Sequence, residues 1–442
     1  MRRGFLQSRK HEAASARAPY PTRNTKPDRD ERRLFADDDL RALQRIDARG
    51  YTVKELRAWG RKNVRLSDDP CMSARVDLDE FGSTQRLIFR NIKLGTFEIS
   101  TLLDREVLSM LPTRFSPPPT AMESAIEYRS AGRKGWGVFA TQDIRAVSTI
   151  LLVERPVTVV QNTMVMNFGM TKAEAYRELF GRVPASVQPA LMRLNSSQPP
   201  GMYELEEAIL RSNAVGITLP APAVPAPVAM GHNAVFLETS RLNHSCSPNV
   251  IIRFDSESFA LTVRTICPIA KGEEIVLSYI DLSLTATREE RRSLLRDLCH
   301  FECLCGVCAL SEAAIQLSDL RRLRIRDMTR EAIYAPLEAW CREKGRGDLQ
   351  KVIAFHLVAV EEIRVEGLYT TPYFLHVSNL AICFAALEDI RSFRSWMGKA
   401  RDVAVYNLAT DKAVEMLRNI VYPETFPWWG YCKSVRSSKS PV

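Results

Sequence analysis

The feature that most constrains the fold of this chain is a cluster of three cysteines within six residues, Cys303, Cys305 and Cys308. The spacing Cys-x-Cys-x-x-Cys brings three thiolates close enough to bind one tetrahedral Zn²⁺, and a structural zinc site needs a fourth ligand. Cys299 and His300 are candidates nearby in the chain, and Cys246 is a distant candidate. We therefore predict one structural zinc ion, with the fourth ligand left open between these residues.

The chain begins without the apolar stretch of a secretory signal. We therefore expect an intracellular protein, in the nucleus or the cytoplasm, whose cysteines bind metal rather than form disulfides. The 442 residues exceed one ordinary core, so we expect two to four domains. A hydrophobic content of 45% with 26% charged residues indicates a globular protein.

The net charge of +9 arises mainly at the two ends of the chain, and the middle is nearly neutral. A modest basic excess of this kind keeps a protein soluble, so we expect no nucleic-acid partner. No stretch approaches about 18 consecutive apolar residues, so we also expect no membrane association. We treat the protein as a monomer.

Two regions precede the part of the chain that carries the motifs. Residues 1–36 are polar and basic and have no apolar period, which predicts a disordered basic arm. Residues 37–122 combine helical stretches with short apolar runs, which predicts a helical or mixed region of unknown role. Three consecutive prolines at 117–119 indicate a linker near its end.

Residues 123–298 alternate short β-branched and aromatic segments with glycine and polar turns, as β-strands do. A helical insert at about 165–235 interrupts these strands. Thr171 followed three residues later by Glu174 has the pattern of a capping box at the start of a helix. The cysteine-rich segment 299–310 follows, and we predict that it holds the zinc ion.

Residues 311–422 contain six apolar-periodic segments typical of helices. We expect them to stack in pairs as a tetratricopeptide-like (TPR-like) array, with an irregular bundle as the alternative. The aromatic residues of the tail, 423–442, should pack on these helices. The fold class predicted is thus α+β, a β-rich domain with a helical insert followed by a zinc-bound segment and an all-α C-terminal region.

Three segments besides the helices carry potential chemistry. Residues 133–140 include Gly135 and Gly137, and such glycines let a backbone approach a ligand closely. Residues 240–249 gather Asn, His, Ser and Cys around a proline, and burying so many polar groups requires a ligand or a specific hydrogen-bond network. The segment 272–279 ends a predicted strand with a tyrosine.

These segments resemble SET-domain lysine methyltransferases over residues 123–310. The motifs Asn-His-Ser-Cys-x-Pro-Asn, Gly-Glu-Glu-Ile-x-x-Ser-Tyr and Phe-x-Cys-x-Cys-x-x-Cys occur in this order and are specific when taken together. Within that class the chain resembles the SET and MYND branch and its fungal relatives. The resemblance implies a SET fold in which the first two motifs cross in a pseudoknot, and methyl transfer from S-adenosylmethionine to lysine.

The resemblance also implies roles for individual residues. The residues implied for the S-adenosylmethionine pocket are Lys134, Gly135, Trp136, Asn213, Asn243, His244 and Phe301. Tyr279 would be the active-site tyrosine, with an orienting role. The zinc ligands implied are Cys246, Cys303, Cys305 and Cys308, and the ion would tie the segment after the SET domain to the Asn-His-Ser-Cys loop.

The chain departs from the family at two points. Residues 130–240 contain no cysteine, so the MYND zinc finger is absent. Cys299 stands where relatives often carry an aromatic residue. The function implied is S-adenosylmethionine-dependent methylation of a lysine in a histone or non-histone protein. The alternative is a catalytically weak SET-fold scaffold that binds protein partners through its helical C-terminal region.

Overall fold

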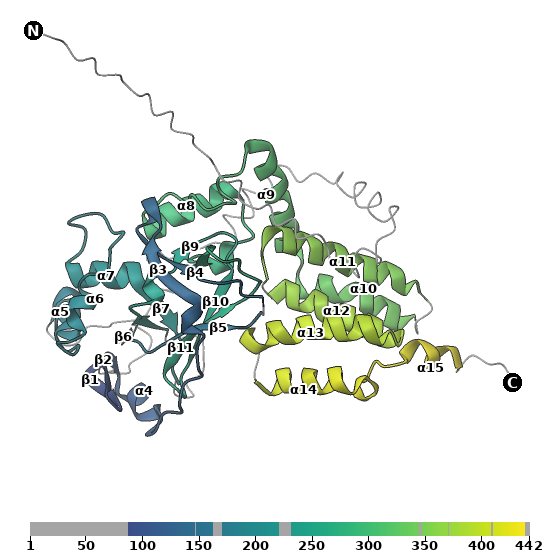
Figure 1. The fold of residues 1–442 in the computed structure, drawn as a ribbon, viewed down its shortest axis with the longest axis horizontal. Helices are drawn as coiled ribbons and strands as arrows, with labels where there is room; N and C mark the ends of the chain where they lie inside the picture. The colour runs from purple at the N-terminus through teal and green to yellow at the C-terminus, as the bar shows by residue number, and fades with distance from the viewer. Residues whose placement is uncertain are drawn as a thin grey trace, which may run out of the picture. The chain divides into compact units, whose positions relative to one another are not determined.

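The computed structural model describes residues 87–437, apart from short gaps at 146, 162–169, 221–230, 344–346, 370 and 408–409. The predicted arm at 1–36 and residues 37–86 lie outside the described residues. The described part has the predicted α+β order, with strands and a helical insert first and a run of helices after them (Figure 1).

The first sheet has five strands in the order β1, β2, β6, β8 and β7. Their bounds are Leu87–Leu94 for β1, Phe97–Asp104 for β2, Thr158–Gln161 for β6, Ala214–Ile217 for β7 and His232–Val235 for β8. β1 and β2 form an antiparallel hairpin around Gly95, whose φ of +66° suits glycine. β2 runs parallel to β6, with Ser100 opposite Thr158. The hairpin at 87–104 therefore extends a sheet whose other strands come from the predicted β-rich domain.

The segment between the hairpin and the next strand is also held against the β-rich domain. After helix α4 (Arg105–Met110), the ring of Phe115 lies 5.3 Å from that of Phe259. The backbone N–H of Met122 donates to the carbonyl of Ile150 at 2.8 Å. The proline-rich stretch between these contacts thus connects two parts of one packed unit.

Two smaller sheets, with strand orders β10–β11–β5 and β3–β4–β12–β9, complete the β-structure. Their bounds are Ile126–Ser130 for β3, Trp136–Ala140 for β4, Ile150–Glu154 for β5, Asn243–His244 for β9, Val250–Asp255 for β10, Ala260–Thr265 for β11 and Glu274–Leu277 for β12. Most pairs are antiparallel, but the short strand β9 is parallel to β12 and places His244 opposite Leu277. This pairing brings two of the motif segments side by side.

Apolar side chains of the sheets form one buried core. Leu151, Phe236, Phe259 and Leu261 belong to it, and each is at most 1% exposed. Burying an aliphatic or aromatic side chain contributes about 1.5–3 kcal/mol to folding. This core is the rigid base on which the short strands β4, β9 and β12 lie.

The helical insert consists of α5 (Lys172–Gly181), α6 (Gln188–Leu191) and α7 (Leu205–Asn213). The capping box predicted at its start is present, since Glu174 N donates to Thr171 Oγ1 at 3.2 Å and Thr171 N donates back to Glu174 Oε2 at 2.7 Å. The insert buries Leu179 and Ile209 in a cluster that includes Leu102 of the five-stranded sheet. The insert therefore covers that sheet.

The C-terminal region is helical, as its apolar period predicts. The helices are α8 (Arg288–Cys299), α9 (Glu312–Asp327), α10 (Arg330–Arg342), α11 (Leu349–Glu366), α12 (Thr371–Ala386), α13 (Ile390–Asn407), α14 (Thr410–Val421) and α15 (Tyr431–Ser437). The tail packs on them as expected, because the ring of Trp429 lies 5.5 Å from Phe393 and that of Tyr431 lies 5.4 Å from Trp340. The TPR-like arrangement and the domain boundaries stay predictions.

Two histidines face each other between α11 and α12. The Nδ1 atoms of His356 and His376 are 2.9 Å apart, and both side chains are fully buried. Burial lowers the pKa of His376 to about 4. Burial and then the neighbouring His376 lower the pKa of His356 to about 3. Both values lie below the ~6.5 of an unfolded histidine, so the unfolded state binds protons first, and stability falls as the pH drops from about 6.5 towards 4.

We expect the His376→Gln variant to be less sensitive to acid than the parent protein. One histidine whose pKa falls from ~6.5 to about 4 makes folding roughly 2 kcal/mol less favourable at pH 5 than at neutral pH. Urea unfolding at pH 7.5 and pH 5 should show a drop in unfolding free energy smaller by about that amount in the variant. His300→Gln, at an exposed position, is the control, and equal drops in all three proteins would contradict the prediction.

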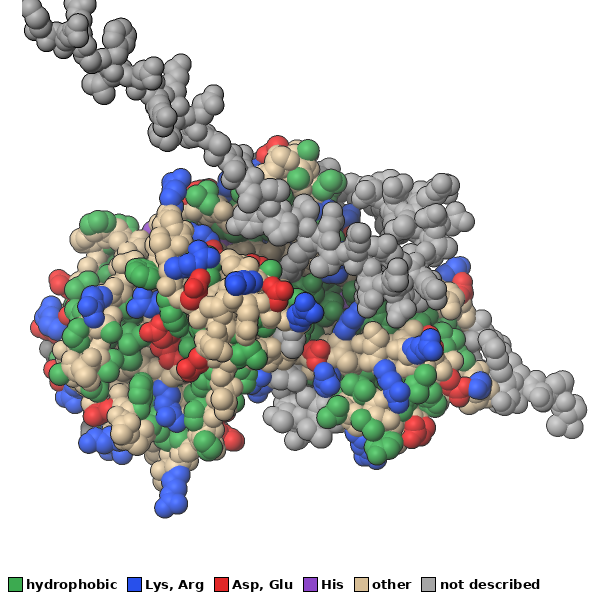
Figure 2. Space-filling view, viewed as in Figure 1, with side chains coloured by type: hydrophobic (Ala, Val, Ile, Leu, Met, Phe, Trp, Pro, Cys, Tyr) green, Lys and Arg blue, Asp and Glu red, His purple; other side chains and the backbone are tan. Residues whose placement is uncertain are grey.

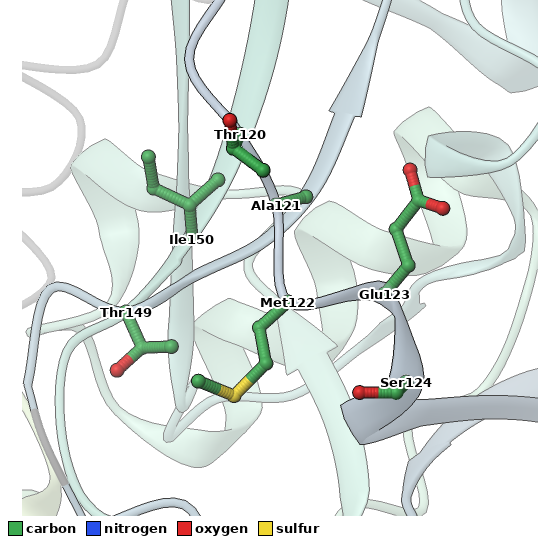
Figure 3. A pocket seen from close by; sticks show the side chains of 7 residues that line it. All are labelled: Thr120, Ala121, Met122, Glu123, Ser124, Thr149 and Ile150. Carbon is green, nitrogen blue, oxygen red and sulfur yellow. The ribbon is translucent and has the colours of Figure 1, made fainter.

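Two surface features complete the description. A pocket of about 700 Å³ is lined by Thr149 and Ile150 at the start of β5 and by residues 120–124. Figure 3 shows Met122 extending towards Thr149 while Glu123 points away. The pocket shares no residue with the predicted site.

On the face seen in Figure 2, basic and acidic side chains are interspersed. Among the described helices, none is both long and apolar enough to cross a membrane.

Candidate functional site

Strand β4 begins with a turn that lets its backbone come close to other groups. Gly135 has a φ of +80°, at which any other residue would be strained. A Cβ at Gly137 would lie 3.0 Å from Glu274 Oε1 and 3.1 Å from Asn243 Nδ2. A side chain at this position would have to displace these two groups, so the close packing favours glycine. Trp136, between the two glycines, remains 56% exposed.

The polar segment that begins with β9 is buried, and β12 satisfies its hydrogen bonds. Ser245 N donates to the carbonyl of Leu277 at 2.9 Å. The side chain of Asn249 donates to the carbonyl of Glu274 at 2.8 Å and accepts from Val276 N at 2.8 Å. The polar density seen in the sequence therefore reflects a specific hydrogen-bond network rather than a solvated loop.

Glu274 joins three of the predicted site residues. Its Oε1 accepts from Asn243 Nδ2 at 2.8 Å, and the same amide donates to the carbonyl of Trp136 at 3.0 Å. Its other oxygen pairs with the ammonium group of Lys134. Glu274 was not predicted as a site residue, and its signal in the sequence was its place as the second acid of Gly-Glu-Glu. The carboxylate fixes the relative positions of β4 and β9.

Tyr279 follows β12 and is anchored through its hydroxyl. The hydroxyl donates to the carbonyl of Leu242 at 2.8 Å in a part-buried bond, although the residue as a whole is 43% exposed. Desolvation of the hydroxyl, followed by negative charge on Cys299 and Glu274, raises the pKa of Tyr279 above the ordinary phenol value. At neutral pH the hydroxyl is therefore a protonated hydrogen-bond donor and not a base.

His244 connects Tyr279 to the cysteine cluster. Its Nδ1 accepts from Tyr279 N at 3.0 Å, which leaves the ring proton on Nε2, 3.4 Å from Cys246 Sγ. Desolvation lowers the pKa of His244 to about 4, so the ring is neutral at pH 7. The ring of Phe301 lies 6.1 Å from His244 and 6.2 Å from Tyr279. The structure thus brings three predicted residues together as an aromatic group.

Asn213 lies at the end of α7, and its described side-chain hydrogen bonds are made within the helical insert. Its side chain donates to the carbonyl of Asn195 at 2.8 Å and to that of Ile209 at 2.9 Å. The amide nitrogen of Asn195 would in turn be 3.7 Å from a Cβ at Gly135. The described contacts of Asn213 therefore position Asn195 beside the glycine turn. The sequence offered no motif that could have identified Asn195.

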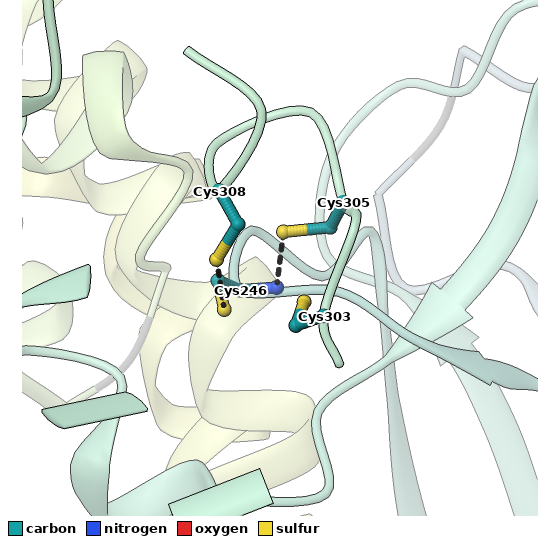
Figure 4. A group of neighbouring side chains, drawn as sticks. All are labelled: Cys246, Cys303, Cys305 and Cys308. Carbon is teal, nitrogen blue, oxygen red and sulfur yellow. Dashed lines mark hydrogen bonds between the residues drawn. The ribbon is translucent and has the colours of Figure 1, made fainter. Parts of the chain in front are cut away.

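The four predicted zinc ligands converge. The ligand atoms of Cys246, Cys303, Cys305 and Cys308 all lie within 4.8 Å of one another, and each residue is at most 7% exposed. Figure 4 shows the side chains turned towards a common centre. Cys246 Sγ is 3.6 Å from Cys308 Sγ, near the ~3.8 Å edge of a tetrahedron with metal–sulfur bonds of ~2.3 Å. Cys246, and not Cys299 or His300, completes the group.

One cysteine of the cluster is held as a thiolate, which suits a cation. Hydrogen bonds from the thiol of Cys246, and then from those of Cys303 and Cys308, hold the pKa of Cys305 well below its ordinary value. The backbone N–H of Cys246 donates to Cys305 Sγ at 3.4 Å. Four buried cysteine sulfurs around one point are the donor set that Zn²⁺ takes in structural sites.

Comparison with known proteins identifies a domain in this part of the chain. The model of the SET domain matches residues 135–280. Histone-lysine N-methyltransferase set5 of Schizosaccharomyces pombe is 39% identical over 107 residues, which are 23% of this chain and 33% of that protein. N-lysine methyltransferase SMYD2 of Bos taurus is 36% identical over 176 residues, 38% of each chain.

Two further comparisons are a curated protein and a solved structure. N-lysine methyltransferase SMYD2-B of Danio rerio is 38% identical over 157 residues, 34% of this chain and 35% of that protein. A solved structure of the SET domain of LSMT bound to lysine and AdoHcy covers 72% of this chain and 88% of that one, but its TM-score of 0.27 and identity of 11% support no residue-level comparison. The matches span about a third of the length of the curated relatives. The chain thus contains a SET domain at residues 135–280 and is related over part of its length to the N-lysine methyltransferase SMYD2 and to the fungal protein set5.

Proposed function

We propose that this protein transfers a methyl group from S-adenosylmethionine to the side-chain amine of a lysine in another protein. The observation that carries the proposal is the anchored hydroxyl of Tyr279, which lies in one hydrogen-bonded unit with His244 and the end of β12. The lysine methyltransferase activity in the names of the matched relatives supports the same reaction. Both histone and non-histone substrates are compatible with the proposal.

The residues proposed to hold S-adenosylmethionine are Lys134, Gly135, Trp136, Asn213, Asn243, His244 and Phe301. The backbone at Gly135 fits a closely held ligand, because its φ of +80° excludes a side chain that would keep the ligand at a distance. The exposed ring of Trp136 and the partly buried ring of Phe301 offer apolar surface. When bound, the cofactor supplies a methyl group on a positively charged sulfur.

The protein's own tasks are to orient the amine and to exclude water. A lysine with a pKa near ~10.4 must lose a proton before it can attack, which costs roughly 4.6 kcal/mol at pH 7. Tyr279 cannot act as the base, since its pKa is raised and its proton is donated to Leu242. We assign to its hydroxyl, and to the carbonyl it contacts, the placement of the amine in a channel of low polarity.

We further propose that the four cysteines hold one structural Zn²⁺. The donor set fits the ion, and His244 links it to the aromatic group through its Nε2–H bond to Cys246. Bound in this way, the ion fixes the segment at 303–308 against the loop after β9. We expect the protein to act as a monomer in the nucleus or the cytoplasm, with any further protein partner at the helical C-terminal region.

S-adenosylhomocysteine is expected to raise the melting temperature of the purified protein. At a ligand concentration 100 times the dissociation constant, binding to the folded state alone adds about 2.7 kcal/mol to stability. Differential scanning fluorimetry measures the shift, with adenosine at the same concentration as control. A methyl-transfer assay on histones and cell lysate with radiolabelled donor then tests catalysis. If the ligand binds but no methyl group is transferred, the scaffold function is favoured. If neither ligand binding nor methyl transfer is observed, the proposed enzyme activity is refuted.

A further inference from the structure

A buried arginine lies behind the cysteine cluster. Arg291 of α8 is 0% exposed. It shares a helix face with Leu295, four residues on, and Leu295 belongs to the buried cluster that contains all four cysteines. The next residue, Arg292, donates from Nη2 to the carbonyl of Cys308 at 2.9 Å. Helix α8 therefore presents a guanidinium group to the metal-binding segment from within the protein.

The hydrogen bonds of Arg291 are incomplete among the described residues. One nitrogen, Nη1, donates to the carbonyl of Ala286 and lies 3.7 Å from Asp319 Oδ1. The other two, Nε and Nη2, are buried and have no hydrogen-bond partner. An uncompensated buried charge costs several kcal/mol, so the site requires a negative group that faces these nitrogens.

The neighbouring carboxylates do not supply enough negative charge. Arg322 is also 0% exposed, and its Nε donates to Glu366 Oε2 at 2.8 Å. Arg321 donates to the other oxygen of the same carboxylate at 2.7 Å. Three arginines thus share two carboxylates, those of Asp319 and Glu366, which leaves one positive charge in excess. Four thiolates around Zn²⁺ carry a net charge of about −2 and would supply the missing negative charge.

We propose that Arg291 is a positioning residue that supplies the buried counter-charge of the four-cysteine zinc centre. The inference rests on the zinc site proposed above. Arginine is always charged at neutral pH. The two unpartnered nitrogens of Arg291 belong to the helix whose Leu295 packs in the same buried cluster as the four cysteines.

Arg322 also attaches the loop that carries Cys246 to the C-terminal helices. Arg322 Nη2 donates to Ser247 Oγ at 3.2 Å and to the carbonyl of Glu366 at 3.2 Å. Gly367 ends α11 with a φ of +68°, and a Cβ there would be 3.1 Å from that of Ser247. The zinc centre and helices α9 and α11 therefore share one ionic cluster.

The test measures zinc retention rather than catalysis. Outer-shell partners of metal ligands typically change metal affinity by 10- to 100-fold, so we expect Arg291→Met to lose zinc to a chromophoric chelator about that much faster than the parent protein. Arg291→Lys keeps the charge and should remain within a few-fold of the parent. Arg296→Gln, on the same helix but with its side chain 51% exposed, is the matched control. Release from Arg291→Met within twofold of the parent, or equal release from the Met and Lys variants, would overturn the inference.

Asp319→Asn tests the charge argument in the opposite direction. Its side chain is 22% exposed and its oxygen can still accept from Arg288 N, so the variant should fold even if Arg291→Met does not. Removing this carboxylate leaves Arg291 more dependent on the thiolates, so zinc release should be unchanged or slower. Faster release would contradict the role of Arg291. A parent protein that contains no zinc by mass spectrometry would instead refute the zinc site itself.

Discussion

Tyr279→Phe is expected to lose methyl transfer by about 100-fold or more, while S-adenosylhomocysteine still raises the melting temperature of the variant. Removing one oriented donor from a reacting centre typically costs 10²–10³ in rate. The ring contacts with His244 and Phe301, at 5.4 Å and 6.2 Å, do not depend on the hydroxyl. Radiolabelled methyl transfer and scanning fluorimetry on the same preparations measure the two properties.

The matched control for this variant is Tyr422→Phe, since Tyr422 is 56% exposed and distant in sequence from every predicted site residue. It should keep both transfer and ligand binding. Undiminished transfer by Tyr279→Phe would refute the assigned role, and loss of the thermal shift would mean that the hydroxyl serves cofactor binding instead.

Cys305→Ser is expected to lower the zinc content from about one ion per chain to nearly none. Cys305 is buried, and its sulfur accepts from the backbone of Cys246, so the change removes a ligand and weakens the link between two segments. Because binding free energy at a structural zinc site is folding free energy, the loss should lower unfolding stability by several kcal/mol. Inductively coupled plasma mass spectrometry and urea unfolding give the two numbers.

Cys341→Ser is the control for the zinc measurement, because Cys341 lies in α10, outside the four-cysteine group. Its zinc content and unfolding free energy should stay close to those of the parent. If Cys305→Ser bound zinc as well as Cys341→Ser does, the four cysteines would not be the metal site.

Elements whose stabilising contacts are local in the chain were predicted from local sequence patterns. The capping box at Thr171 and Glu174 forms as predicted, because its hydrogen bonds involve residues three apart. Helices form between 312 and 421, in the region where the apolar-periodic segments predicted them. In both cases the physical cause acts over one or two turns of chain, which a sequence displays directly.

The sequence did not predict which distant segments come into contact. The hairpin at 87–104 joins the sheet through parallel pairing of β2 with β6, and no short-range pattern indicates such a partner. Glu274 binds Lys134 and Asn243, which stand 140 and 31 residues away in the chain. Glutamates are common on strands, so the sequence does not distinguish Glu274 from the adjacent Glu273. Only their neighbours in the folded protein do.

The sequence by itself determined the classes of chemistry in this protein: a cysteine group suited to zinc, a tyrosine at the end of a strand, glycines at a close turn, and helices after them. Only the tertiary structure decided among the candidates that the residues alone left open for the fourth ligand, in favour of the Cys246 that the family resemblance implied. It also showed that Glu274 bridges β4 and β9, and that two nitrogens of the buried Arg291 lack partners among the described residues. The reason is that ligand geometry and the balance of buried charge depend on contacts between residues 31 to 140 positions apart in the chain, which residue type alone does not specify.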